Sequence, residues 1–98
     1  MDPFASYTFS PGSIATNAAE VFADDNADLA VLPVAFILPN GDPNAPALSL
    51  RMTLTGGTTI TLPITPDVPY PFRVQRFHVT GSDAAFTGAT PQRIVTLW

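Results

Sequence analysis

Prolines follow one another so closely in this sequence that a long helix has no room to form. From residue 33 onward they stand at positions 33, 39, 43, 46, 63, 66, 69, 71 and 91. Each removes a backbone N–H and clashes with the preceding turn of a helix. Threonine is abundant, lysine is absent and glutamate occurs once, at Glu20, a balance that favours strands and turns. Only residues 17–23 keep helical character, and a helix of one or two turns is expected there.

Two neighbouring segments, 48–55 and 59–64, alternate strictly between apolar and polar residues. This period of two predicts a hairpin with one buried face. A three-residue loop at 56–58, closed by a glycine bulge, would place Leu54 opposite Ile60 and keep both apolar sets on the same face. A two-residue Gly-Gly loop would mix the two faces.

Three further strands are expected, at 34–38, 72–80 and 93–98. The apolar phase changes within 72–80, which predicts a bulge near Gln75 and Arg76; a strand buried on both faces is the alternative. Pro63 predicts an edge strand or a strand end. About six short strands without crossover helices indicate an all-β fold, a small antiparallel β-sandwich or partly open barrel. The strand order stays open.

The 98 residues allow one domain, which we expect to consist of two parts. Residues 1–28 carry small and polar residues and scattered aromatics, and they predict an extended N-terminal arm. Residues 29–98 carry the strand patterns and predict the β-sandwich domain. In the arm, the aromatic side chains would act as anchors on a neighbouring surface, although a simple unstructured tail has the same composition.

The chain carries unusually little charge. Charged residues make up 12% of the sequence against 46% hydrophobic residues, the net charge is −4, and all four cations are arginines. Without lysine or a dense basic face, the chain is unsuited to nucleic acid or an anionic membrane surface. The absence of cysteine excludes disulfides and thiolate metal sites. So weakly charged a surface is expected to be partly covered by other protein.

No catalytic constellation emerges from the sequence. His78 is the only histidine, and no serine stands in a nucleophile-elbow context, so we expect neither catalytic residues nor a cofactor. Tyr7, Tyr70 and Trp98 could form an aromatic platform for a sugar, but a core or subunit-interface role is the simpler interpretation.

The spacing of Asp24, Asn26 and Asp28 matches the start of a calcium-binding loop. Leu29 replaces the required glycine, and Ala35 stands where a glutamate ligand would be needed. We therefore expect no metal but a polar turn in which an aspartate bonds local amides. A contact with an arginine of a neighbouring subunit is a further option for this turn.

Arginine without lysine is typical of protein interfaces, because the planar guanidinium pairs with carboxylates and is weakly hydrated. The plain alternative is ordinary solvated charge. Together with the aromatic anchors, the arginines give the predicted partner interface: Phe4, Tyr7, Phe9, Phe22, Arg51, Tyr70, Arg73, Arg76 and Trp98.

Four segments together resemble the head-spike base proteins of gene-transfer agents and related tailed phages. They are DDNADL at 24–29, LTGGTTIT at 54–61, PFRVQRFHVTG at 71–81 and the closing IVTLW at 94–98. Their order and approximate spacing agree over residues 20–98.

The resemblance implies a minor structural protein of a phage virion, located on the capsid surface. It would be a head-spike base or a capsid cement (decoration) protein that anchors a fibre or reinforces the shell. Its partners would be further copies of itself in a homo-oligomer, the major capsid protein and a spike fibre protein. No catalytic residues accompany the family. Two alternatives stay open: a carbohydrate-binding module of a tail or host-recognition apparatus, and a neck or tail adaptor.

Overall fold

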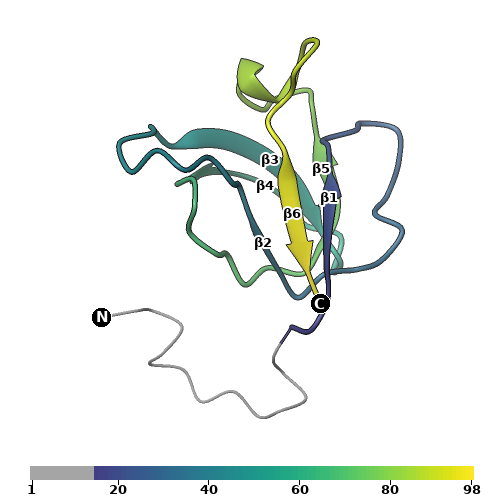
Figure 1. The fold of residues 1–98 in the computed structure, drawn as a ribbon. Helices are drawn as coiled ribbons and strands as arrows, with labels where there is room; N and C mark the ends of the chain where they lie inside the picture. Colours follow the sequence, from purple (N-terminus) through teal and green to yellow (C-terminus); the bar gives the residue numbers. More distant parts are fainter. Residues whose placement is uncertain (1–14) are drawn as a thin grey trace.

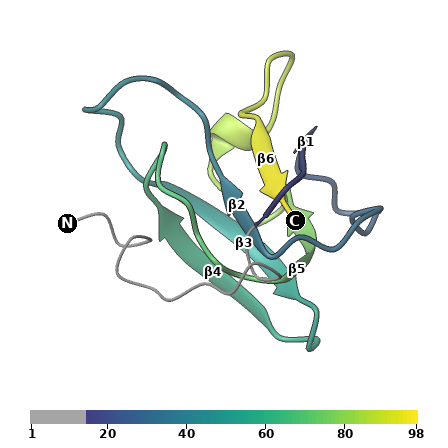
Figure 2. The same ribbon diagram turned by 60° about the horizontal axis from the view of Figure 1, so that its bottom comes forward.

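The computed structural model describes residues 15–98, which form two packed three-stranded antiparallel sheets (Figures 1 and 2). One sheet has the strand order β1-β6-β2 and the other β4-β3-β5. The strands are β1 (Ala18–Val21), β2 (Ala35–Ile37), β3 (Leu48–Leu54), β4 (Thr59–Ile64), β5 (Val74–His78) and β6 (Ile94–Leu97). The predicted all-β sandwich is therefore confirmed. Ala84–Phe86 forms a single 3-10 turn, and within residues 15–98 no helix has the length and apolarity that a membrane crossing needs.

The core lies between the two sheets and is centred on aromatic rings. The buried ring of Phe36 in β2 stacks on Tyr70 with a centroid distance of 5.7 Å and meets Phe77 of β5 edge-on at 5.0 Å. Both are favourable aromatic geometries. The buried cluster comprises Phe36, Leu38, Leu50, Met52, Ile64, Val74, Phe77, Phe86 and Ile94.

The β3–β4 hairpin has the predicted three-residue loop and glycine bulge, but its register differs by two residues. Met52 lies opposite Ile60, and the loop begins one residue earlier than expected. The Leu54 N–H donates to the Thr58 carbonyl, and the Gly57 N–H donates to the Leu54 carbonyl, both at 2.8 Å. The last loop position needs a positive φ, which Gly57 adopts at 94°, whereas the predicted loop would have placed Thr58 there. A slip of two keeps each side chain on its face, so the apolar side still faces the core.

The predicted bulge in the 72–80 strand is confirmed. The pairing of β3 with β5 shifts between Thr53 and Leu54, which leaves Gln75 as the extra residue of β5. The bulge lets both Val74 and Phe77 face the core. Pro63 lies in β4, an edge strand of its sheet, as its missing N–H predicts.

The helix expected at 17–23 is wrong, because Ala18–Val21 forms β1 and pairs with β6. The side chain of Val21 packs against the core, and this tertiary pairing outweighs a weak helix propensity. The predicted arm is thus divided. Residues 15–28 contribute to the sandwich, whereas residues 1–14, with the predicted anchors Phe4, Tyr7 and Phe9, lie outside the described residues.

Candidate interaction surfaces

The turn at 24–29 lies along the outer edge of β5 and provides its hydrogen-bond partners. The Asp24 N–H donates to the Phe77 carbonyl at 2.9 Å, and the Leu29 N–H donates to the Gln75 carbonyl at 2.8 Å. Since these two carbonyls are the outward acceptors of β5, the turn occupies this edge. Another strand therefore has no place to pair here.

The Asp25 carboxylate fixes the turn to the end of β5. It accepts hydrogen bonds from the Val79 N–H at 2.8 Å, from the Thr80 N–H at 3.1 Å and from the Thr80 hydroxyl at 2.7 Å. The Thr80 hydroxyl, followed by the Thr80 N–H, lowers the pKa of Asp25, against a desolvation that raises it. Asp24 accepts a bond from the Asn26 N–H at 2.9 Å, so the predicted polar turn is confirmed.

Arg76 binds the same turn from β5. Its Nη2 lies 2.8 Å from Asp28 Oδ1, and its Nη1 donates to the Asp25 carbonyl at 3.0 Å. A contact of this turn with an arginine of a neighbouring subunit was one option, and here Asp28 pairs with an arginine of its own chain. The part that Arg76 plays at an interface stays a prediction.

A hydroxyl, an imidazole and a carboxylate lie in line beside this turn, in the order of a catalytic relay. Thr53 Oγ1 is 2.8 Å from His78 Nε2, and His78 Nδ1 is 3.6 Å from Asp25 Oδ1. Sequence motifs for such a pattern contain serine or cysteine, so they do not mark Thr53.

The relay is poorly arranged for chemistry. The 3.6 Å separation is too long for a hydrogen bond, and Asp25 already accepts from backbone and hydroxyl donors. Thr53 Oγ1 also lies 2.9 Å from Thr59 Oγ1, and none of these residues lines the hollow described below. The contacts among Thr59, Thr53, His78 and Asp25 instead connect β4, β3, β5 and the 24–29 turn.

Two of the predicted interface arginines are available to an outside partner. The ion pairs among residues 15–98 involve Arg76 and Arg93 but neither Arg51 nor Arg73. Arg73 is exposed. Arg51 lies across Gly81 so closely that a Cβ there would be 2.8 Å from its Cδ. Both guanidinium groups can therefore pair with a carboxylate of another molecule.

The described aromatic residues of the predicted interface have unequal roles. Tyr70 stacks on Phe36, and its hydroxyl accepts a backbone N–H at 2.8 Å, so it supports the core. The Trp98 backbone exchanges hydrogen bonds with Asn17 at 2.8 and 3.0 Å, and its side chain is partly exposed. Phe22 is 48% exposed and is free to contact a partner.

Two neighbouring aliphatic side chains that were not among the predicted interface residues are exposed. Val31 and Leu32 are 47% and 52% exposed and lie just before the strand expected at 34–38. They precede β2 in the connection from β1. Exposed aliphatic side chains of this kind are common at protein contacts.

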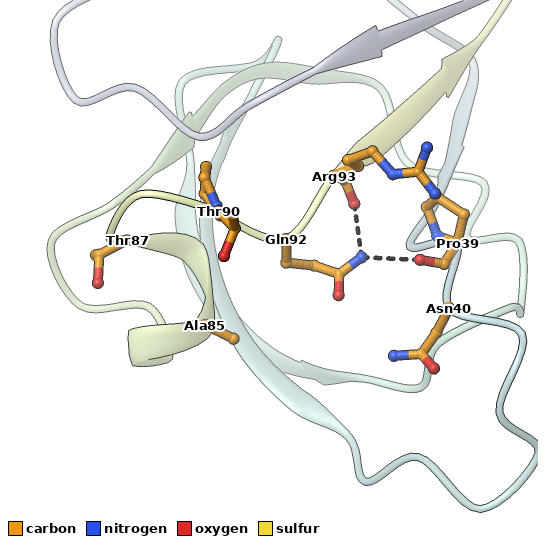
Figure 3. Close-up of a pocket in the computed structure, with 8 residues that line it drawn as sticks. Pro39, Asn40, Ala85, Thr87, Thr90, Gln92 and Arg93 are labelled. Atoms are coloured by element: carbon orange, nitrogen blue, oxygen red, sulfur yellow. Dashed lines mark hydrogen bonds between the residues drawn. The ribbon is translucent and has the colours of Figure 1, made fainter.

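A shallow hollow of about 530 Å³ lies beside the 3-10 turn (Figure 3). The Gln92 side-chain amide crosses its floor and donates to the carbonyls of Pro39 and Arg93, both at 3.0 Å. Arg93 is paired with Glu20 at 3.3 Å. The lining residues are Pro39, Asn40, Ala85, Thr87, Thr90, Pro91, Gln92 and Arg93. The walls offer polar contacts but no nucleophile–base pair.

Among solved structures, the chain is similar to one from "Capsid of native GTA particle computed with C5 symmetry", where GTA denotes a gene-transfer agent. The likeness has a TM-score of 0.66 and 26% sequence identity, and it covers 100% of both chains. No protein-family model matches the sequence, and a search of the curated proteins gives no match. In fold and over its full length, this chain is thus similar to a structural component of a gene-transfer-agent capsid, which supports a structural protein of the phage and gene-transfer-agent class.

Proposed function

We propose that the protein is a minor structural protein of a phage-like virion. It forms a homo-oligomer on the capsid surface and acts as a head-spike base or as a cement protein that reinforces the shell. The observation that carries this proposal is the full-length likeness to a chain of a native GTA capsid, which supports a location in the virion. No catalytic step belongs to this role.

The described surface suits adhesion. Phe22, Val31 and Leu32 offer apolar contact, and Arg51 and Arg73 offer guanidinium groups without an ion-pair partner in residues 15–98. Buried apolar area contributes about 25 cal/mol per Å². Contacts that are weak for one copy become effectively permanent when several copies bind together.

The partners in this role are other copies of the chain, the major capsid protein and a spike fibre protein. The predicted anchors of the arm, Phe4, Tyr7 and Phe9, would lie on the capsid or on a neighbouring copy. A head-spike base would occupy capsid vertices, a cement protein would be spread over the shell, and a neck or tail adaptor would lie at one portal vertex.

The test is to add purified protein to particles that lack it, and to locate it by cryo-electron microscopy. We expect saturable binding and a copy number set by the symmetry of the particle. A protein that stays monomeric at high concentration and leaves such particles bare would contradict the proposal. The position of the added density separates spike base, cement protein and adaptor.

A matched pair of variants tests the guanidinium contact. Arg73→Ala removes an exposed arginine without an ion-pair partner in residues 15–98, and we expect its occupancy on particles to fall severalfold while its melting temperature is unchanged. Arg93→Ala removes the same charge from a group already paired with Glu20 and should bind normally. Equal loss in both variants would show that only net charge matters.

A further inference from the structure

Within residues 15–98, each sheet has one edge that is occupied and one that is open. In the β4-β3-β5 sheet, the turn at 24–29 covers β5. In the β1-β6-β2 sheet, Phe36 of β2 exchanges backbone hydrogen bonds with Tyr70 at 2.8 and 3.0 Å, and the Asp67 N–H donates to the Leu38 carbonyl. The outer edges of β1 and β4 have no backbone partner within residues 15–98.

The open edge of β4 presents a short row of backbone groups. The hydrogen bond between Leu54 and Thr58 and the pairing register fix which residues face β3, because bonded and non-bonded pairs alternate in an antiparallel ladder. Thr59, Thr61 and Pro63 therefore turn their backbone groups outward. Pro63 offers a carbonyl but no N–H, so the row of donors ends at Thr61.

The open edge of β1 is also short. The reciprocal bonds between Asn17 and Trp98 and the β1–β6 register leave the backbone groups of Ala18 and Glu20 pointing outward. Phe22 follows directly after β1 and is 48% exposed. A strand laid along β1 would cover part of this ring in addition to pairing with the backbone.

The two open edges lie on opposite sides of the sandwich. The chain leaves β1 and turns at once onto β5, through the bonds of the 24–29 turn, so β1 and β5 share one side, as Figure 1 shows. In Figure 2, β4 forms the border away from β1. An interface between two different edges on opposite sides is heterologous, and repeating it generates a ring where the rotation between copies closes.

We propose that copies of this chain join head to tail, with the β1 edge of one copy hydrogen-bonded to the β4 edge of the next. This inference rests on the homo-oligomer of the proposed function and names the surfaces that form it. The occupant of each edge is a second copy, because copies related by a fivefold rotation, the symmetry with which the similar capsid structure was computed, can touch only through two unlike surfaces. Residues 15–98 provide one such pair of edges. The contact is a short β-augmentation, in which main-chain bonds provide the attraction.

Cross-linking tests this pairing directly, because the chain has no cysteine of its own. Glu20→Cys and Thr61→Cys each place one thiol at an open edge, and both native side chains are exposed. The two purified full-length variants are treated with a short bismaleimide, separately and mixed. We expect a covalent dimer in the mixture and none with either variant alone, and a ladder of covalent oligomers from the chain that carries both cysteines.

A backbone variant gives an independent measure. Thr61→Pro removes the outward N–H but no bond to β3, and Pro63 two residues later shows that β4 accepts proline at an outward position. We expect Thr61→Pro to keep the circular dichroism spectrum of the wild type and to lose its oligomer in sedimentation. Thr61→Ser keeps the N–H and should assemble normally.

The outcomes separate this inference from the proposed function. Covalent dimers from a single variant alone would indicate that β1 pairs with β1, or β4 with β4, of another copy. This result would overturn head-to-tail pairing. Oligomers that form but give no β1–β4 cross-link would show another occupant of these edges, such as residues 1–14, and would overturn the inference while the virion role stands. A protein that remains monomeric and does not bind particles would overturn both.

Discussion

At the scale of single residues, a few positions fix the geometry on which the surfaces depend. Gly57 closes the β3–β4 loop with a φ of 94°, and Asp25 holds the turn that covers β5. Both act through the backbone, one by conformation and the other by accepting N–H bonds. Their effects should therefore be visible in stability before they are visible in assembly.

Gly57→Ala should destabilise the protein by about 1–2 kcal/mol, because an alanine pays the steric cost of a left-handed backbone. Gly56→Ala is the matched control. An added Cβ meets nothing within 4 Å at either glycine, and only Gly57 has a positive φ. Urea unfolding of the two variants measures the difference, and equal stabilities would contradict the assigned loop.

Asp25 should make stability depend on acid pH. Its pKa is lower in the folded chain than its ordinary value, chiefly through the Thr80 hydroxyl. Its contribution is therefore complete above the ordinary carboxyl pKa of about 4 and is lost as the pH falls through the lowered folded value. Asp25→Asn should be less stable than the wild type at neutral pH and should lose less stability on acidification. Urea unfolding over a pH series measures both slopes, and parallel slopes would contradict the prediction.

At the scale of elements, the local patterns were predictable and the long-range contacts were not. The hairpin, the bulge at Gln75 and the edge position of Pro63 follow from alternation, glycine and proline within a few residues. The two-residue register error arose because either register keeps the apolar face inward, and only the φ required at Gly57 decides between them. No such local signal marks β1.

The contacts of the candidate surfaces join residues far apart in the sequence. Asp28 and Arg76 are separated by 48 positions, and Asp25 and Thr80 by 55. Nothing in the sequence states which carboxylate each donor will meet. The exposure of Val31 and Leu32, which precede the expected strand 34–38, was hidden for a similar reason, because apolar residues in a connection do not reveal whether the core covers them.

Two phenylalanine variants distinguish a side chain that packs in the core from one that contacts a partner. Phe36→Ala removes a buried ring that touches both Tyr70 and Phe77 and should cost about 3–5 kcal/mol of stability. Phe22→Ala changes a ring that is 48% exposed and should leave the melting temperature nearly unchanged while weakening self-association. Thermal unfolding and sedimentation measure the two effects. A large loss of stability in Phe22→Ala would assign this ring to the core.

At the scale of the whole molecule, each side of the sandwich has one sheet edge with backbone partners and one without, within residues 15–98. The occupied edges hold the fold together, and the edges that have no backbone partner within residues 15–98 are the surfaces of the proposed assembly. This division suits a chain with only 12% charged residues to the assembly proposed above.

Deleting residues 1–12 should leave the sandwich folded, because all six strands lie between Ala18 and Leu97 and the described core cluster is built from residues of these strands and their connections. The predicted arm anchors would be removed, so we expect lower occupancy on particles that lack the protein. Circular dichroism and a particle-binding assay measure the two results. A truncated chain that fails to fold would show that the first residues belong to the core.

Pro63 also affects the protein between its synthesis and its assembly. A border of a sheet that accepts one more strand can also seed uncontrolled fibrils while newly made chains are crowded together. One residue that cannot donate a hydrogen bond keeps the adhesive stretch too short for such growth. The outward backbone groups of Thr59 and Thr61 still suffice for the pairing with a second copy proposed above. A single proline can thus favour an oligomer of defined size over an aggregate.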